Sequence, residues 1–245
     1  MNLTIDQGNS RTKVALFDDN GRIKKTFTYR SFSSADVERL FALYPIEASI
    51  ISSVISIEPA IVNALSRLSR RFILFDHLTP IPLVNGYDTP QTLGQDRLAA
   101  AIGANYLCPD ENLLIIDAGT AITCDFVSNQ NVFLGGNITA GIKMRLKALH
   151  QMTKKLPLVE VDENELIPLI AKNTRDAIVT GVVRGVAFEV KGYIRAMEEQ
   201  TEHCKTFLTG GHAPYILHNV QSDIKYEKNL VLIGLNRVLR YNDKD

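Results

Sequence analysis

Two short segments of the sequence repeat the same order of chemical groups. The first reads Asp6-Gln7-Gly8-Asn9-Ser10-Arg11-Thr12-Lys13, and the second reads Asp117-Ala118-Gly119-Thr120-Ala121-Ile122-Thr123. In this alignment Asp6 corresponds to Asp117 and Thr12 to Thr123. Glycine lets backbone N–H groups approach a phosphate, and the carboxylate can organise a cation beside it. Either segment alone reads as an ordinary hairpin turn. Because the pattern occurs twice after an apolar stretch, it favours two similar halves that bind one nucleotide.

Phosphoryl transfer is the chemistry that such a pair of turns serves. It needs a cradle for the phosphates, a divalent cation and an acceptor placed in line with the γ-phosphate. The sequence contains neither a Walker A pattern nor G-x-G-x-x-G. P-loop and Rossmann interpretations therefore lose support.

A third segment, Gly94-Gln95-Asp96-Arg97, stands where a loop opens a predicted helix. One interpretation is structural: Asp96 caps the helix and Arg97 is solvated. The other is an acceptor-binding turn, with Asp96 as a general base and Arg97 holding an anionic group such as a carboxylate. The spacing alone leaves both open.

Further glycine-rich and capping segments are also ambiguous. Gly135-Gly136 and Gly141 precede a predicted basic helix with Lys143, Arg145 and Lys147, so they either line a cleft or form a tight turn. The double glycine of Thr209-Gly210-Gly211 either admits a flat ring such as adenine or links a strand to a helix. Asn173-Thr174 either caps the next helix or reaches a ligand.

Strands and helices are expected to alternate along the whole chain, which predicts an α/β fold. Strands are predicted at residues 2–7, 12–17, 48–54, 72–75, 113–117, 122–127 and 205–208. Helices are predicted at residues 59–70, 96–106, 139–151 and 173–198, with a last helix ending near residue 240. The segment Pro109–Asn112 precedes the second Asp-x-Gly turn, so we predict an N-terminal half of residues 1–110 and a C-terminal half of residues 111–245.

Composition excludes several functional classes. The 27 Lys and Arg residues balance the 27 Asp and Glu residues, so no general attraction to nucleic acid or an anionic membrane is expected. We expect no signal peptide, because the first residues lack a basic segment followed by a long apolar one. We expect no membrane span, because no apolar run approaches the ~20 residues that a span needs. The widely spaced Cys108, Cys124 and Cys204 suggest reduced thiols in the cytoplasm. The five histidines show no metal or triad spacing, so each is expected at the surface or in the core.

Together these segments resemble the type III pantothenate kinases of the acetate kinase/sugar kinase/Hsp70/actin superfamily. The resemblance rests on residues 6–13, Gly94–Arg97 and Asp117–Ala121, and it extends through Gly135-Gly136, Leu156-Pro157, Lys172–Thr174, Thr209–Gly211 and residues 230–235. These blocks cover nearly the whole chain, and the Gly-x-Asp-Arg block separates this family from other members of the superfamily. In fold, the resemblance implies two actin-like (ribonuclease H-like) halves, each a mixed sheet flanked by helices, with a nucleotide cleft between them.

In function, the resemblance implies ATP-dependent phosphorylation of pantothenate, the first committed step of coenzyme A synthesis. It implies a homodimer that uses magnesium with ATP and a monovalent cation, either potassium or ammonium. Asp96 would be the proton acceptor. ATP would be bound by Asp6, Gln7, Gly8, Asn9, Ser10, Arg11, Thr12, Lys13 and Thr120. Pantothenate would be bound by Tyr87, Gly94, Gln95, Asp96, Arg97 and Thr174. Asp117 would help to bind the monovalent cation, and Asp6 would organise magnesium through water.

Two alternatives and one departure remain. The alternatives are a non-catalytic nucleotide-binding regulator of the same fold and a kinase for another small hydroxyl compound. The departure is Ala140, which stands where the family usually has proline before the glycine at position 141. Proline would fix the backbone there.

Overall fold

The computed structural model describes residues 1–163, 165–220 and 222–243 of the chain. Their contacts form two compact units. The first contains residues 1–109, 131–134 and 229–243, and the second contains residues 110–130 and the described part of 135–228. The last helix therefore belongs to the first unit, whereas a single boundary at residue 110 would assign it to the second.

The first unit is built on a five-stranded sheet with the order β3-β2-β1-β4-β5. Its strands are β1 (Asn2–Gln7), β2 (Thr12–Phe17), β3 (Ile23–Tyr29), β4 (Ala48–Ser53) and β5 (Arg71–Leu74). The first three strands are antiparallel, whereas β4 runs parallel to β1 and β5 runs parallel to β4. The ends of β1 and β4 therefore lie side by side.

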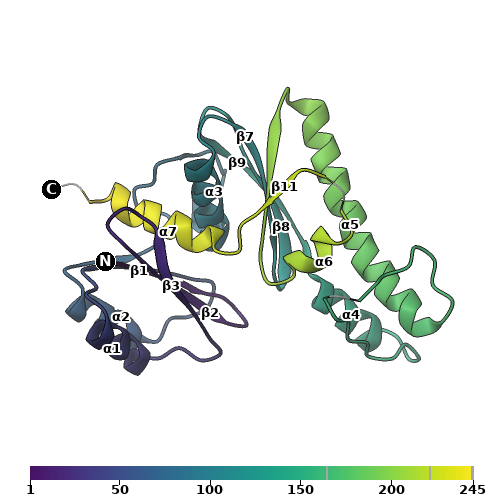
Figure 1. Cartoon of the computed structure of the whole chain (residues 1–245), viewed down its shortest axis with the longest axis horizontal. Coiled ribbons are helices and arrows are strands. Elements are labelled where there is room, and N and C mark those ends of the chain that lie inside the picture. Colours follow the sequence, from purple (N-terminus) through teal and green to yellow (C-terminus); the bar gives the residue numbers. More distant parts are fainter. Residues whose placement is uncertain (164, 221, 244–245) are drawn as a thin grey trace. The chain divides into compact units, whose positions relative to one another are not determined.

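Helices cover both faces of this sheet because alternate strand residues are apolar on both sides. Leu3 and Ile5 of β1 pack with α1 (Ser34–Leu43) and α2 (Pro59–Leu68). On the other face, Leu232 of α7 (Leu230–Tyr241) packs on β2 (Figure 1).

Two glycines let α3 (Gln95–Leu107) pack closely against α7. A Cβ on Gly234 would overlap the backbone of Ala99, and one on Gly103 would overlap Leu230. This close packing of α7 on α3 joins the end of the chain to the first unit.

The second sheet has the order β11-β10-β7-β8-β9-β6. Its strands are β6 (Val84–Asn85), β7 (Asn112–Ala118), β8 (Ala121–Val127), β9 (Val132–Ala140), β10 (Cys204–Thr209) and β11 (Ile224–Tyr226). The first residues of β9 pair with β6, and both segments group with the first unit. Three helices, α4 (Ile142–Gln151), α5 (Thr174–Gln200) and α6 (Ala213–Leu217), contribute to the core of the second unit (Figure 1). A 3-10 helix, η1 (Pro90–Thr92), precedes α3.

The α/β prediction is confirmed, with two sheets that are both flanked by helices. One local prediction is wrong: residues 139 and 140 belong to β9 and not to a helix, and Gly135-Gly136 lies within that strand. The helix begins only at Ile142, because Gly141 is extended with φ −72° and ψ 166°. The strand β3 and the helix α1 lack a strong local signal and were not predicted.

Candidate active site

The first Asp-x-Gly turn joins β1 to β2. The backbone pairs Asp6 with Lys13 and Gln7 with Thr12. The N–H of Gly8 donates to the carbonyl of Arg11 at 3.1 Å, which closes the turn. The tip, residues 9–11, is exposed, whereas Thr12 is buried. The turn therefore presents its backbone to solvent from a fixed hairpin.

The end of β4 supports this turn from the side. Gln7 pairs in register with Ser53, whose hydroxyl donates to the side-chain oxygen of Gln7 at 3.1 Å. The N–H of Val54 also donates to the backbone carbonyl of Gln7 at 3.1 Å. Ser52 is in register with Asp6, and its hydroxyl is buried without a hydrogen-bond partner among the described residues. The two serines that end β4 thus lie beside the first carboxylate.

The second Asp-x-Gly turn joins β7 to β8 in the second unit and is tighter. The N–H of Gly119 donates to the carbonyl of Ala121 at 2.9 Å. Asp117 pairs with Thr123, so the residue opposite this carboxylate is a neutral hydroxyl. The alignment of Thr12 with Thr123 is therefore not the structural one, because Lys13 is the residue that faces Asp6. The two turns thus share a backbone arrangement, but the residue opposite the aspartate is cationic in the first and neutral in the second.

The double glycine after β10 packs against the second turn. Gly210 has φ 93°, a region open mainly to glycine, and a Cβ there would overlap Asp117 and Ala118. His212 lies beyond it, and its N–H donates to the carbonyl of Ala118 at 2.8 Å. Its ring nitrogen Nδ1 lies 2.8 Å from the carbonyl of Gly119. Burial lowers the pKa of His212, which favours a neutral ring that donates to this carbonyl.

His212 is a residue that sequence reasoning did not assign to a site. The expectation of a surface or core role missed its contact with the second turn. The only signal available was its position directly after Thr209-Gly210-Gly211.

The glycine that follows β9, Gly141, also allows a close approach of the backbone. A Cβ on Gly141 would overlap the carbonyls of Gly119 and Thr120, and the N–H of Gly141 donates to Thr120 at 3.1 Å. Ala140 ends the strand, and its carbonyl accepts from Nε of Arg145 at 2.7 Å. The alanine is therefore compatible with the tight contact that the next residue makes.

The Gly94–Arg97 segment opens α3 in the first unit. The N-cap residue is Gly94, not Asp96, so the structural interpretation of Asp96 as the cap is wrong. Asp96 is half-buried, and its Oδ1 accepts from the N–H of Arg97 at 2.9 Å. Arg97 is only 6% exposed, which also contradicts a solvated role. The side-chain oxygen of Gln95 is buried and unpaired among the described residues.

Tyr87 lies beside this segment. The guanidinium carbon of Arg97 lies 5.6 Å from the centre of the Tyr87 ring, a cation–π distance. Four polar side chains, those of Tyr87, Gln95, Asp96 and Arg97, are thus grouped at the N-terminus of α3 in the first unit. A buried cation and a half-buried carboxylate at a helix N-terminus can bind an anionic group and accept a proton.

Electrostatics sets the protonation of Asp96. Burial raises the pKa of Asp96, because the carboxylate loses hydration. Hydrogen bonds from the backbone N–H groups of Arg97 and Asp96, and the charge of Arg97, oppose this rise. A carboxyl group with a raised pKa is better matched to accepting a proton near neutral pH than an exposed aspartate is.

Thr174 belongs to the second unit. It is the first residue of α5, whose N-cap Asn173 accepts from the N–H of Asp176 at 2.9 Å. Thr174 borders a groove of about 370 Å³ whose other lining residues are apolar, namely Leu149, Leu156, Ala177, Ile178, Gly181 and Val182.

The carboxylates suit a nucleotide-bound magnesium ion better than a protein-caged metal. Among residues 1–163, 165–220 and 222–243, no three His, Cys, Asp or Glu side chains are grouped to hold a metal. Magnesium bound with a nucleotide typically needs one or two carboxylates, with phosphates and water as its other ligands. Asp6, half-buried beside a phosphate-type turn, fits that arrangement.

None of the helices in the described part of the chain has the length and hydropathy of a membrane span.

Known proteins of similar sequence and structure cover the whole chain. The sequence model of the type III pantothenate kinase family matches residues 2–196. A type III pantothenate kinase from Phocaeicola vulgatus is 43% identical over 244 residues, with 100% of both chains covered.

Two solved structures indicate the fold alone. A Campylobacter jejuni protein described as a Baf family transcriptional activator has a TM-score of 0.64 at 23% identity, over 98% of both chains. A ROK family glucokinase from Streptomyces griseus, in complex with glucose and AMPPNP, has a TM-score of 0.53 at 10% identity, over 98% of both chains. The fold is accordingly the actin-like fold of sugar kinases. By the match over residues 2–196 and the identity over its full length, the chain belongs to the type III pantothenate kinase family.

Proposed function

We propose specific roles for the residues of this chain in the ATP-dependent phosphorylation of pantothenate, the activity of its family. Asp96 accepts the proton of the primary hydroxyl as that oxygen attacks the γ-phosphate of ATP. The observation that carries this role is the half-buried Asp96 carboxylate at the start of α3, next to the buried Arg97.

The pantothenate site lies around the start of α3. Arg97 binds the carboxylate of pantothenate, for which a guanidinium offers matched hydrogen-bond donors. Tyr87, Gly94 and Gln95 complete the contacts. The support is that Tyr87 packs on Arg97 and that Gln95 carries a buried oxygen unpaired among the described residues.

ATP is bound by the two Asp-x-Gly turns. Residues 6–13 and Thr120 contact the phosphates, and Asp6 orients magnesium through water. Magnesium neutralises charge on the transferred phosphoryl group when it is bound. The support is that each turn is closed by a backbone hydrogen bond of its glycine and that Lys13 faces Asp6.

Asp117 helps to bind a monovalent cation, either potassium or ammonium. The residue opposite Asp117 is Thr123, whereas Asp6 faces a lysine. The neutral Thr123 in register with Asp117 adds no positive charge that would repel a cation there. Gly210 is also required against this carboxylate, so the space around Asp117 is restricted.

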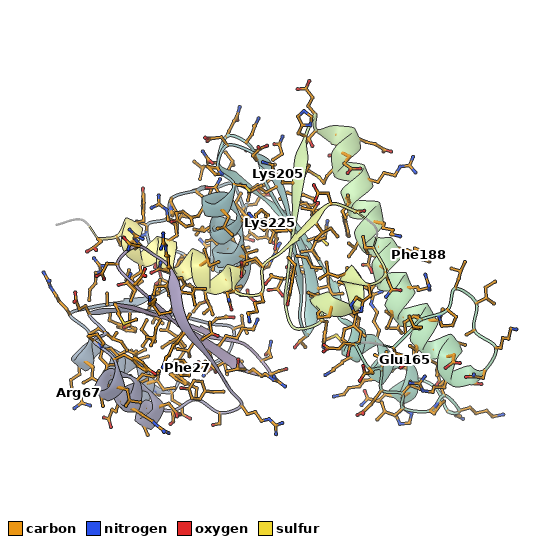
Figure 2. All side chains as sticks on the ribbon, in the orientation of Figure 1. Phe27, Arg67, Glu165, Phe188, Lys205 and Lys225 are labelled. Atoms are coloured by element: carbon orange, nitrogen blue, oxygen red, sulfur yellow. The ribbon has the colours of Figure 1, made fainter. Side chains whose placement is uncertain are left out.

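The active protein is a homodimer, with Thr174 contributing to pantothenate binding in the assembly. The face of α5 that bears Gly181, Gly185, Phe188 and Gly192 supports this. These residues follow helical spacing, and a Cβ on each glycine would meet nothing among the described residues. Phe188, labelled in Figure 2, is 54% exposed. Small residues around an exposed aromatic ring form a surface on which a second helix can pack.

The cytoplasm is the compartment that fits this activity. Cys108, Cys124 and Cys204 are all free thiols, as expected in a reducing compartment. Burial raises the pKa of Cys124 to about 12, so that thiol stays protonated.

An ADP-release assay tests the substrate. The protein is incubated with ATP, Mg²⁺ and potassium, with and without pantothenate. We expect ADP to form only with pantothenate. Release with a different hydroxyl compound in its place would favour another small-molecule kinase, and no release with any acceptor would favour a nucleotide-binding regulator.

A further inference from the structure

The loop that carries Tyr87 is fastened to the start of β9. The strand β6 pairs in parallel with β9, with Val84 opposite Val132 and Asn85 opposite Phe133. The N–H of Gly86 donates to the carbonyl of Phe133 at 2.9 Å. The side chain of Asn85 accepts from the N–H of Tyr87 at 3.1 Å. The backbone N–H groups of Gly86 and Tyr87 are therefore both held by hydrogen bonds.

The side chain of Phe133 also contacts the ring of Tyr87. Its centre lies 6.2 Å from the centre of the Tyr87 ring, with an angle of 49° between the planes. Phe133 is fully buried, whereas Tyr87 is half-buried. The guanidinium carbon of Arg97 lies 5.6 Å from the centre of the same ring, so Tyr87 contacts both a buried aromatic ring and a buried cation. Pairs of aromatic rings in this range attract each other beyond their burial.

Gly86 shows how close the loop lies to β9. A Cβ at this position would lie 2.9 Å from the carbonyl oxygen of Phe133 and 3.2 Å from Cγ1 of Val132. Any side chain there would push the loop away from the strand. Glycine is therefore needed for the contact that brings Tyr87 onto Phe133.

We propose that Phe133 is a positioning residue for pantothenate binding, which acts by holding Tyr87 against Arg97. This inference rests on the proposed roles of Tyr87 and Arg97 in binding pantothenate. Phe133 is buried and contacts no substrate itself. Its loss would leave Tyr87 mobile and Arg97 without a fixed aromatic face, so the binding of the pantothenate carboxylate would weaken. Binding of ATP would not change.

The test compares steady-state kinetics of Phe133→Leu, Tyr87→Leu, the double variant and a matched control. The control is Tyr106→Leu, which removes a ring of α3 that lies 5.5 Å from the guanidinium carbon of Arg237, outside the site. We expect Phe133→Leu to raise the KM for pantothenate by about threefold to tenfold, in keeping with the loss of an aromatic pair. The KM for ATP and kcat should change by less than about twofold, and Tyr106→Leu should leave the KM for pantothenate unchanged.

The double variant distinguishes a role of Phe133 in positioning Tyr87 from a general loss of packing. If Phe133 acts through Tyr87, the double variant should have the same KM for pantothenate as Tyr87→Leu alone. Multiplied effects, or an equal rise in both KM values after Phe133→Leu, would overturn the inference. Because loss of a buried ring can prevent folding, Gly86→Ala provides a second test. This variant keeps Phe133 in the core but displaces the Tyr87 loop. We expect it to raise the KM for pantothenate to the same extent.

Two failures can be told apart. If Tyr87→Leu itself leaves the KM for pantothenate unchanged, the proposed role of Tyr87 fails and the inference fails with it. If Tyr87→Leu raises that KM but Phe133→Leu and Gly86→Ala do not, only the inference is overturned and the role of Tyr87 stands.

Discussion

Gly94 lies directly against the carboxylate of Asp96, so that a Cβ added at residue 94 would lie 2.7 Å from Oδ1. The backbone of Gly94, with φ −58° and ψ 126°, is a conformation that alanine adopts without strain. The glycine at the start of the Gly-x-Asp-Arg segment is thus required by the space that the proposed base occupies and not by its backbone angles.

Gly94→Ala should displace the Asp96 carboxylate and lower kcat by about tenfold to a hundredfold, since small displacements of a reacting group are costly. The melting temperature should change little, because the backbone can stay in place. Gln91→Ala, at an exposed residue of η1 just before this segment, serves as the control. A kcat equal to that of the unmodified protein would mean that the carboxylate tolerates the shift and is not held for catalysis.

Asp96→Asn should lower the rate by roughly 10²–10⁴, the usual contribution of a general base. The amide keeps the size of the side chain but cannot accept the proton. Rates of ADP formation at saturating ATP and pantothenate measure the effect. Asp88→Asn, which changes an exposed carboxylate on the loop after Tyr87, should be nearly neutral. Near-normal turnover of Asp96→Asn would remove Asp96 from this role.

The raised pKa of Asp96 predicts a shifted pH profile. The carboxylate is the active form, so kcat/KM should fall as the pH drops through the raised pKa, which lies above the value of about 3.9 for an exposed aspartate. The same shift has a consequence for stability. Burial disfavours the charged form in the folded state, so the ionised carboxylate destabilises the fold at neutral pH.

Asp96→Asn should therefore raise the free energy of unfolding at pH 7. The gain should shrink as the pH falls through the pKa that Asp96 has in the folded state. It should vanish below the pKa that Asp96 has in the unfolded state, because the carboxyl group is then neutral in both states. Urea unfolding at several pH values measures it. A variant that is less stable at pH 7 would show that the hydrogen bonds to the carboxylate outweigh its burial.

Asp117→Asn should weaken activation by potassium. Removing the charge should raise the potassium concentration for half-maximal activity by about tenfold or more, while the KM for pantothenate stays constant. Asp223→Asn, at an exposed residue of the same unit, is the control. Titration of ADP formation against potassium in a sodium background checks this. An unchanged potassium curve would exclude Asp117 as a ligand of that ion.

Phe188→Asp should dissociate the proposed homodimer. A charge in place of a central aromatic ring should cost about 2 kcal/mol or more of association free energy. Sedimentation velocity over a range of protein concentrations measures this. Tyr226→Asp, at a ring that is 43% exposed on β11, should leave the dimer intact. A Phe188→Asp protein that remains dimeric would place the interface elsewhere.

The sequence by itself determined the elements with strong local signals. The Asp-x-Gly turns, the helix from residue 95 and the long helix from residue 174 follow from turn residues and apolar spacing, which act over a few neighbours. It also determined the family, because the Gly-x-Asp-Arg segment is specific. It did not predict that Gly135-Gly136 lies inside β9, because a glycine pair reads as a turn unless the partner strand is known.

Only the tertiary structure decided which residues face each other. Strand register placed Lys13 opposite Asp6 but Thr123 opposite Asp117, although a simple alignment matches Thr12 with Thr123. It also placed the buried Arg97 against the Tyr87 ring and brought Phe133 to the Tyr87 loop from a distant part of the chain. Such contacts depend on pairing and packing between segments far apart in sequence, so the local pattern of a single sequence does not predict them.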